Sequence, residues 1–90
     1  MSMTKASFKS SVEGLGFSLQ EGVQTIEVPF RVIVEYTAVV SEGIVYATLL
    51  EGRRLSVNFN EEDFVKIRPN VREPLYKVIC EYDYTELSER

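Results

Sequence analysis

The chain contains no histidine, and Cys80 is the single cysteine among its 90 residues. Histidine is the commonest general base and a frequent metal ligand, so its absence excludes a Ser–His or Cys–His nucleophile built from this chain alone. One cysteine permits no internal disulfide. We expect Cys80 to be a small buried hydrophobic residue, and we expect neither a metal site nor a cofactor, because one thiol cannot complete a thiolate set.

Long apolar runs and positive charge are also scarce. No stretch approaches the roughly 20 apolar residues of a membrane span, and the N-terminus has no apolar signal core. The chain has 10 Lys and Arg against 14 Asp and Glu, a net charge of −4, whereas nucleic-acid binding needs clustered basic residues. We therefore predict one soluble, cytoplasmic domain over residues 1–90, without a membrane or nucleic-acid partner.

The segment that is richest in signal is "QTIEVPFRVIVEYTAVV", residues 24–40. Its even positions are almost all apolar, which indicates a β-strand with its even face toward a core. Pro29 cannot donate to a strand ladder, so we expect a bend there. The odd face carries charges, but it also carries Ile33 and Val39, so we expect that face to be covered. An N-terminal helix that offers Phe8, Val12 and Leu15 would hide part of it, and a second molecule would cover the remainder.

The dipeptide Glu-Gly recurs and marks candidate turns, because glycine tolerates positive φ. We predict a hairpin turn at 21–22, a three-residue loop that ends at Gly43, and a two-residue loop at 51–52. The second turn would pair Val40 with Ile44. The predicted pairs of the third turn are Thr48–Leu55, Tyr46–Val57 and Ile44–Phe59.

Two segments have helical signals. Phe8, Val12 and Leu15 are spaced as on one helix face, which predicts a helix over residues 5–13 with Thr4 as its N-cap and residues 1–4 disordered. Asn60 followed by three acids predicts one helical turn near 61–66. The acids suit a helix start better than a cation site.

We interpret "LYKVICEYDY", residues 75–84, as a last strand. Pairing residues 30–36 with 76–82 antiparallel would set Arg31 opposite Glu81. The predicted fold is α+β and mainly β. A short N-terminal helix is followed, over residues 15–84, by a strongly bent, partly closed antiparallel sheet or a small barrel of about five strands.

The missing catalytic groups and the apolar odd face predict a function without enzyme chemistry. We expect an interaction module that binds a protein partner, as an adaptor, an inhibitor or an assembly subunit, and that self-associates as a homo-oligomer. The interface candidates are Val39, Val45, Ile33 and Leu49, with Glu42 on the rim.

The alternative is a small-ligand or nucleotide binder with a site lined by arginine and tyrosine, on the sheet or at a barrel mouth. Arginine side chains suit phosphate and carboxylate groups. The candidate residues for this anion or ligand site are Arg31, Arg53, Arg54, Arg68 and Arg72.

Overall fold

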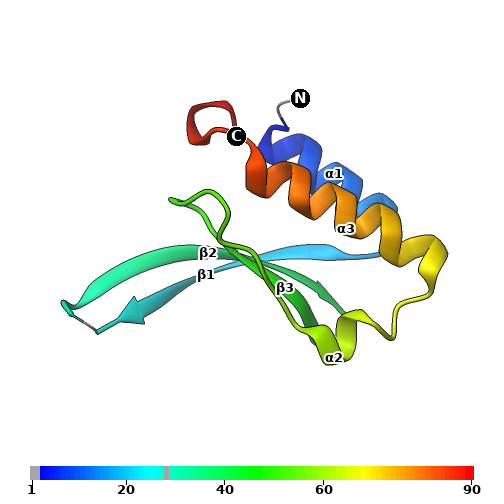
Figure 1. Cartoon of the computed structure of the whole chain (residues 1–90), viewed down its shortest axis with the longest axis horizontal. Coiled ribbons are helices and arrows are strands. Elements are labelled where there is room, and N and C mark those ends of the chain that lie inside the picture. The colour runs from blue at the N-terminus through cyan, green and yellow to red at the C-terminus, as the bar shows by residue number, and fades with distance from the viewer. Residues whose placement is uncertain (1–2, 28) are drawn as a thin grey trace.

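The computed structural model describes residues 3–27 and 29–90. Two longer helices, α1 and α3, lie side by side on one side of an antiparallel sheet with the strand order β1-β2-β3-β4 (Figure 1). The predicted α+β class with a short N-terminal helix is confirmed. The sheet of the described residues has four strands and is open, so the predicted partial closure or barrel of about five strands is wrong. The elements are α1 (Lys5–Gly14), β1 (Ser18–Ile26), β2 (Val32–Ser41), β3 (Ile44–Leu50), β4 (Asn58–Phe59), α2 (Glu61–Phe64), α3 (Pro69–Tyr84) and the 3-10 turn η1 (Leu87–Glu89).

Helix α1 confirms the predicted N-terminal helix. The Thr4 hydroxyl accepts a hydrogen bond from the Ser7 N–H at 3.1 Å and so caps the helix start. The Met3 N–H donates to the Thr85 hydroxyl at 3.1 Å. Residues 3 and 4 are therefore held in place, contrary to the expected disorder, while residues 1 and 2 lie outside the described residues.

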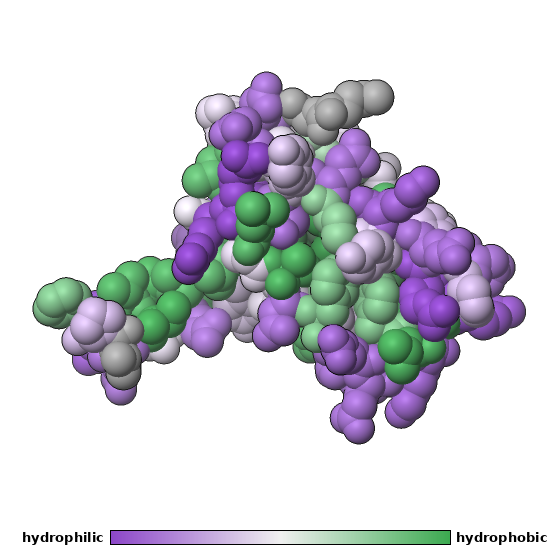
Figure 2. All heavy atoms as spheres, viewed as in Figure 1, coloured by the Kyte–Doolittle hydropathy of each residue, from purple (hydrophilic) through white to green (hydrophobic). Residues whose placement is uncertain are grey.

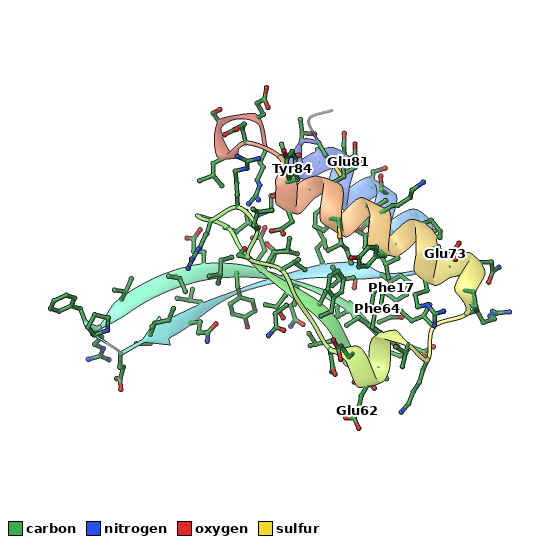
Figure 3. All side chains as sticks on the ribbon, in the orientation of Figure 1. Phe17, Glu62, Phe64, Glu73, Glu81 and Tyr84 are labelled. Carbon is green, nitrogen blue, oxygen red and sulfur yellow. The ribbon has the colours of Figure 1, made fainter. Side chains whose placement is uncertain are left out.

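The C-terminal segment is a helix, and the predicted last strand is wrong. In α3, Leu75, Ile79 and Tyr82 follow helical spacing and are fully buried. Glu81 points away from the sheet (Figure 3), so its predicted pairing with Arg31 does not exist. The even positions from 76 to 84 are all apolar, which favours a strand by alternation, although the buried face combines Leu75 and Ile79 with Tyr82 at a helical period.

The first hairpin turns between the end of β1 at Ile26 and the start of β2 at Val32. Strand β1 runs straight through the predicted turn at 21–22 and pairs with β2 from Ser18–Val40 to Ile26–Val32. The alternating run 24–40 is thus two strands, with Pro29 in the turn between them. Val28, predicted to face the core, lies outside the described residues.

Strands β2 and β3 are joined by a two-residue turn. Glu42 and Gly43 both have positive φ, 51° and 80°, and Ser41 pairs with Ile44, so the predicted three-residue loop is wrong. A bulge follows, because Val39 pairs with Ala47 but Val40 pairs with Val45. Tyr46 is the extra residue, and its ring meets the Phe17 ring edge-on at 5.3 Å.

The predicted tight loop at 51–52 is replaced by a longer connection. Strand β4 pairs Asn58 with Thr48, so residues 51–57 form a loop. Asp83 holds this loop: its carboxylate accepts the Ser56 N–H at 2.8 Å, and its carbonyl accepts the Leu55 N–H at 3.2 Å. All three predicted pairs of this hairpin are therefore wrong.

The core lies between the sheet and the helices, on the odd face of β2. The Phe8 and Tyr82 rings stack at 4.2 Å between centroids, and Phe64 of α2, the predicted helical turn, is buried below α3. Phe8 and Val12 of α1 pack on the odd face, as expected, but the even face of β2, which we expected to be the core wall, is the uncovered one. The core residues are Phe8, Val12, Val39, Ala47, Leu49, Phe64, Leu75, Ile79 and Tyr82.

Candidate interaction surface

The sheet has a second face that no helix covers, which we call the open face. Residues that pair directly across antiparallel strands share a face, so the strand register defines its members. From one end of the sheet to the other, its rows are Ser18, Val40 and Val45; Gln20, Ala38, Thr48 and Asn58; Gly22, Tyr36 and Leu50; Gln24 and Val34; and Ile26 and Val32.

None of these described residues is charged, although 27% of the whole chain is Asp, Glu, Lys or Arg. Antiparallel sheets covered on one side normally carry polar side chains on the other side. Here half of the residues on the uncovered side are aliphatic and the rest are uncharged, and the exposed fractions of Val45 and Val32 are 41% and 48%. An apolar face of this kind on a small chain is typical of an interaction site.

The relief of the open face comes from β2. Ala38 forms the floor of a hollow of about 430 Å³, with Tyr36, Val45 and Thr48 at its border. The Tyr36 ring lies across Gly22, where an added Cβ would come within 2.4 Å of the Tyr36 hydroxyl. Glycine at this position therefore lets the tyrosine lie against the neighbouring strand, beside the hollow.

The β1–β2 hairpin extends beyond the helices as an arm, residues 23–26 and 29–35 of the described chain (Figure 1). Hydrophobic residues gather along it (Figure 2). The register places Ile26 and Val32 on the open face and Val23 and Ile33 on the opposite one. A two-stranded ribbon is marginally stable in water by itself, so this arm gains most from a covering partner. Its exposed apolar side chains are Val23, Ile26, Phe30, Val32 and Ile33.

A polar cluster borders the core on the helix side of the sheet. Lys5 forms an ion pair with Glu21 and lies 3.7 Å from the Glu51 carboxylate, which also accepts hydrogen bonds from buried Thr37 and, at 3.4 Å, from Tyr82. Burial and the nearby Glu51 raise the pKa of Tyr82. The hydrogen bond from Lys5 lowers the pKa of Glu21. These groups satisfy one another, so the cluster is structural.

A further hollow, of about 640 Å³, lies between α2 and α3. Phe64, Val65, Pro74 and Tyr76 make it apolar, and charged residues of α3 form its rim. The Tyr76 hydroxyl also interacts with Cys80 one turn along the helix, and this hydrogen bond raises the pKa of Tyr76. Cys80 itself is half-buried on α3 and does not lie in a strand.

The structure separates the predicted interface residues into two groups. Val39 and Leu49 are fully buried beneath the helices, so they are unavailable to a partner. Val45, Ile33 and Glu42 are exposed. Val45 is on the open face because the two-residue turn pairs it with Val40, whereas Ile33 lies on the arm and Glu42 in the β2–β3 turn.

The five predicted ligand-binding arginines are not gathered into one site. Arg54 donates to the Tyr84 carbonyl at 2.6 and 2.9 Å and pairs with Glu86 at 3.0 Å, while Arg72 donates to the Val65 carbonyl at 2.7 Å. Both stabilise local structure. The other three are exposed and lie apart, Arg31 in the arm turn, Arg53 in the β3–β4 loop and Arg68 before α3.

Sequence reasoning missed the open face because it assigned that face to the core. The signal was present: every even position of the described residues between 18 and 40 is uncharged, yet Gln20 and Gln24 are among them. Glutamine is rarely fully buried, so this combination indicates a face that is neutral and not internal.

Chemistry and comparisons add no further site. Within residues 3–27 and 29–90, no group of three His, Cys, Asp or Glu side chains is placed to hold a metal ion, and no helix is long and apolar enough to cross a membrane. No family model, no curated protein and no solved structure matches the chain.

Proposed function

We propose that this chain is a non-enzymatic interaction module of the cytoplasm that binds a protein partner through the open face. The observation that carries the proposal is an uncovered sheet face with no charged side chain among its described residues. Covering exposed aliphatic and aromatic side chains is favourable by about 25 cal/mol per Å² of apolar surface. A partner that removes this face from water thus gains binding free energy without desolvating a charge.

The proposal is tested by comparing what three tagged forms of the chain retain from extracts of its native host. Val45→Glu places a charge on the open face, and Val65→Glu places the same charge at a 61% exposed position near α2. We expect a specific protein to be lost by the first variant and kept by the matched control. Equal retention by both variants would contradict the proposal.

A second candidate function, binding of a small apolar ligand, is favoured by the hollow between α2 and α3. Its walls are Phe64, Val65, Pro74 and Tyr76, which suit an apolar molecule with an acidic group near Lys77. Titration with medium-chain fatty acids tests this candidate, because Val65→Glu should then weaken binding and Val45→Glu should not.

A further inference from the structure

We infer that the partner of the open face is a second copy of this chain, packed sheet on sheet about a two-fold axis. The inference rests on the proposed function, because it names the partner of the same surface. It follows from the charge, the relief and the size of the open face, and from the residues at the two ends of β2.

Because the open face carries no charge, two copies of it can pack together without burying a charged side chain. A partner surface with charged side chains would leave them desolvated and unpaired against this face, at a cost that apolar contacts do not offset. A second copy of the same neutral face carries no such cost. Two pleated sheets also pack closely, about 10 Å apart, with interdigitating side chains.

The relief of β2 is self-complementary. Tyr36 stands beside the hollow whose floor is Ala38, and the two residues are neighbours on the same face of one strand. A two-fold axis that crosses β2 at the position of Thr37 brings each Tyr36 to Ala38 of the partner subunit. Such a contact is isologous, since each Tyr36 ring, lying over Gly22 of its own sheet, faces the hollow of the opposite copy.

The charged residues at the two ends of β2 favour an antiparallel arrangement of the two copies. Arg31 directly precedes β2 and Glu42 directly follows it, and both side chains are exposed. When the β2 strands cross antiparallel about Thr37, Arg31 of each copy meets Glu42 of the partner subunit at the rim. An axis parallel to β2 would instead bring like charges together.

The open face is small, so a stable dimer must bury nearly all of it. Strands of this length, at the usual rise and spacing, span roughly 30 by 15 Å, or on the order of 450 Å² before the relief of the side chains is counted. Specific interfaces bury about 600–800 Å² per partner. The contact must therefore be centred on β2 and include the arm, as the Thr37 axis provides.

The first experiment measures molar mass in solution by sedimentation equilibrium up to about 1 mM chain. We expect wild type and Val65→Glu to approach twice 10.3 kDa. We expect Val45→Glu and Val32→Glu, which charge opposite ends of the open face, to stay monomeric. Circular dichroism confirms that each variant is folded, and two exposed positions are used so that one unfolded variant does not decide the result.

The second experiment tests the orientation with a charge swap. Arg31→Glu and Glu42→Arg should each weaken dimerisation by roughly threefold to tenfold at low salt, and the double variant should restore it, as expected for two symmetric rim pairs. Failure of the double variant to restore dimerisation would overturn the antiparallel arrangement.

The outcomes separate this inference from the proposed function. A monomeric wild type, or a dimer that persists in both open-face variants, overturns self-association through this face. If the wild type is monomeric and Val45→Glu still loses a specific host protein that Val65→Glu keeps, the proposed function stands with a different partner. If neither a dimer nor such a protein is found, both are wrong.

Discussion

Tyr82 connects most of the core to the polar cluster at its border. Its ring stacks on Phe8 and lies under the Arg90 guanidinium at 4.7 Å, and its hydroxyl donates to Glu51. A single side chain thus contacts α1, the chain end and the residue after β3. The neutral form of the phenol is the one that this environment stabilises.

We predict that stability falls at high pH because of this residue. Burial and the nearby Glu51 raise the pKa of Tyr82 above its ordinary value of 10.0. A group with a raised folded-state pKa stabilises the fold fully below the unfolded-state value, and this contribution is lost as the pH rises through the folded-state pKa. Urea unfolding at a series of pH values should therefore show a decline in the free energy of unfolding that begins near pH 10.

Tyr82→Phe is the control for this decline. The variant keeps the ring stack, loses one hydrogen bond worth about 0.5–1.5 kcal/mol at neutral pH, and should show a shallower alkaline decline. A residual slope is expected, because Lys5 also titrates there: burial works against its charge, but the hydrogen bond to Glu21 raises its pKa. If the free energy of unfolding of Tyr82→Phe fell as steeply at high pH as that of wild type, Tyr82 would not be the cause of the alkaline decline.

At the scale of elements, α3 can be tested against the strand that its composition suggests. Lys77 and Ile79 would share one face of a strand, but they point in different directions on a helix. Ile79 is fully buried and Lys77 is exposed. We predict that Ile79→Ala lowers the free energy of unfolding by about 2–5 kcal/mol and that Lys77→Ala changes it by less than about 0.5 kcal/mol, as measured by urea unfolding.

The arm offers a second test at this scale. Beyond the helices, residues 23–26 pair only with 32–35, and a ribbon of two strands opens readily in water. We predict fast amide exchange at these positions in monomeric Val45→Glu and slower exchange in wild type at concentrations where it associates. Hydrogen exchange followed by mass spectrometry gives the comparison, and equal rates in the two proteins would argue that the arm stays uncovered.

The elements differ in how well the sequence predicts them. Helix α1 and the turn α2 were predictable because Thr4 and the acids at 61–63 mark their starts, and because Phe8 and Val12 share a helix face. Helix α3 was not, since apolar residues occupy both parities around Ile79. The class of the fold was nevertheless predictable, because the β2 segment alternates over most of its length and the turn at Gly43 joins it to a second apolar segment, β3.

The surface was predictable only in part. Val45 and Ile33 were expected to be available to a partner and are exposed, whereas Val39 was expected beside Val45 and is in the core. The difference arises from the turn, which has two residues and pairs Val40 with Val45, so Val45 shares the open face; the bulge at Tyr46 then returns Ala47 and Leu49 to the side of Val39.

For the whole molecule, a small chain with an uncovered apolar face becomes more stable against unfolding when a partner covers that face. The principal extents of 42, 29 and 17 Å describe a thin body, which buries less of its surface than a round one. We predict that the melting temperature of wild type rises with protein concentration, because association stabilises only the folded chain, and that Val45→Glu melts at a constant temperature. Differential scanning fluorimetry over a range of concentrations measures both, and a constant wild-type value would contradict the prediction.

The bulge at Tyr46 changes which side of the sheet the odd-numbered and even-numbered residues of β3 face. Before it, Ile44 lies on the helix side of the sheet and Val45 on the open side; after it, Ala47 and Leu49 are on the helix side and Thr48 is on the open side. A substitution map of β3 would therefore show tolerance to polar residues at exposed Ile44 and Val45, and after Tyr46 intolerance at the odd positions Ala47 and Leu49. For the same reason, deletion of Tyr46 alone would exchange inside and outside for one half of the strand, and would be far more harmful than any replacement of its side chain.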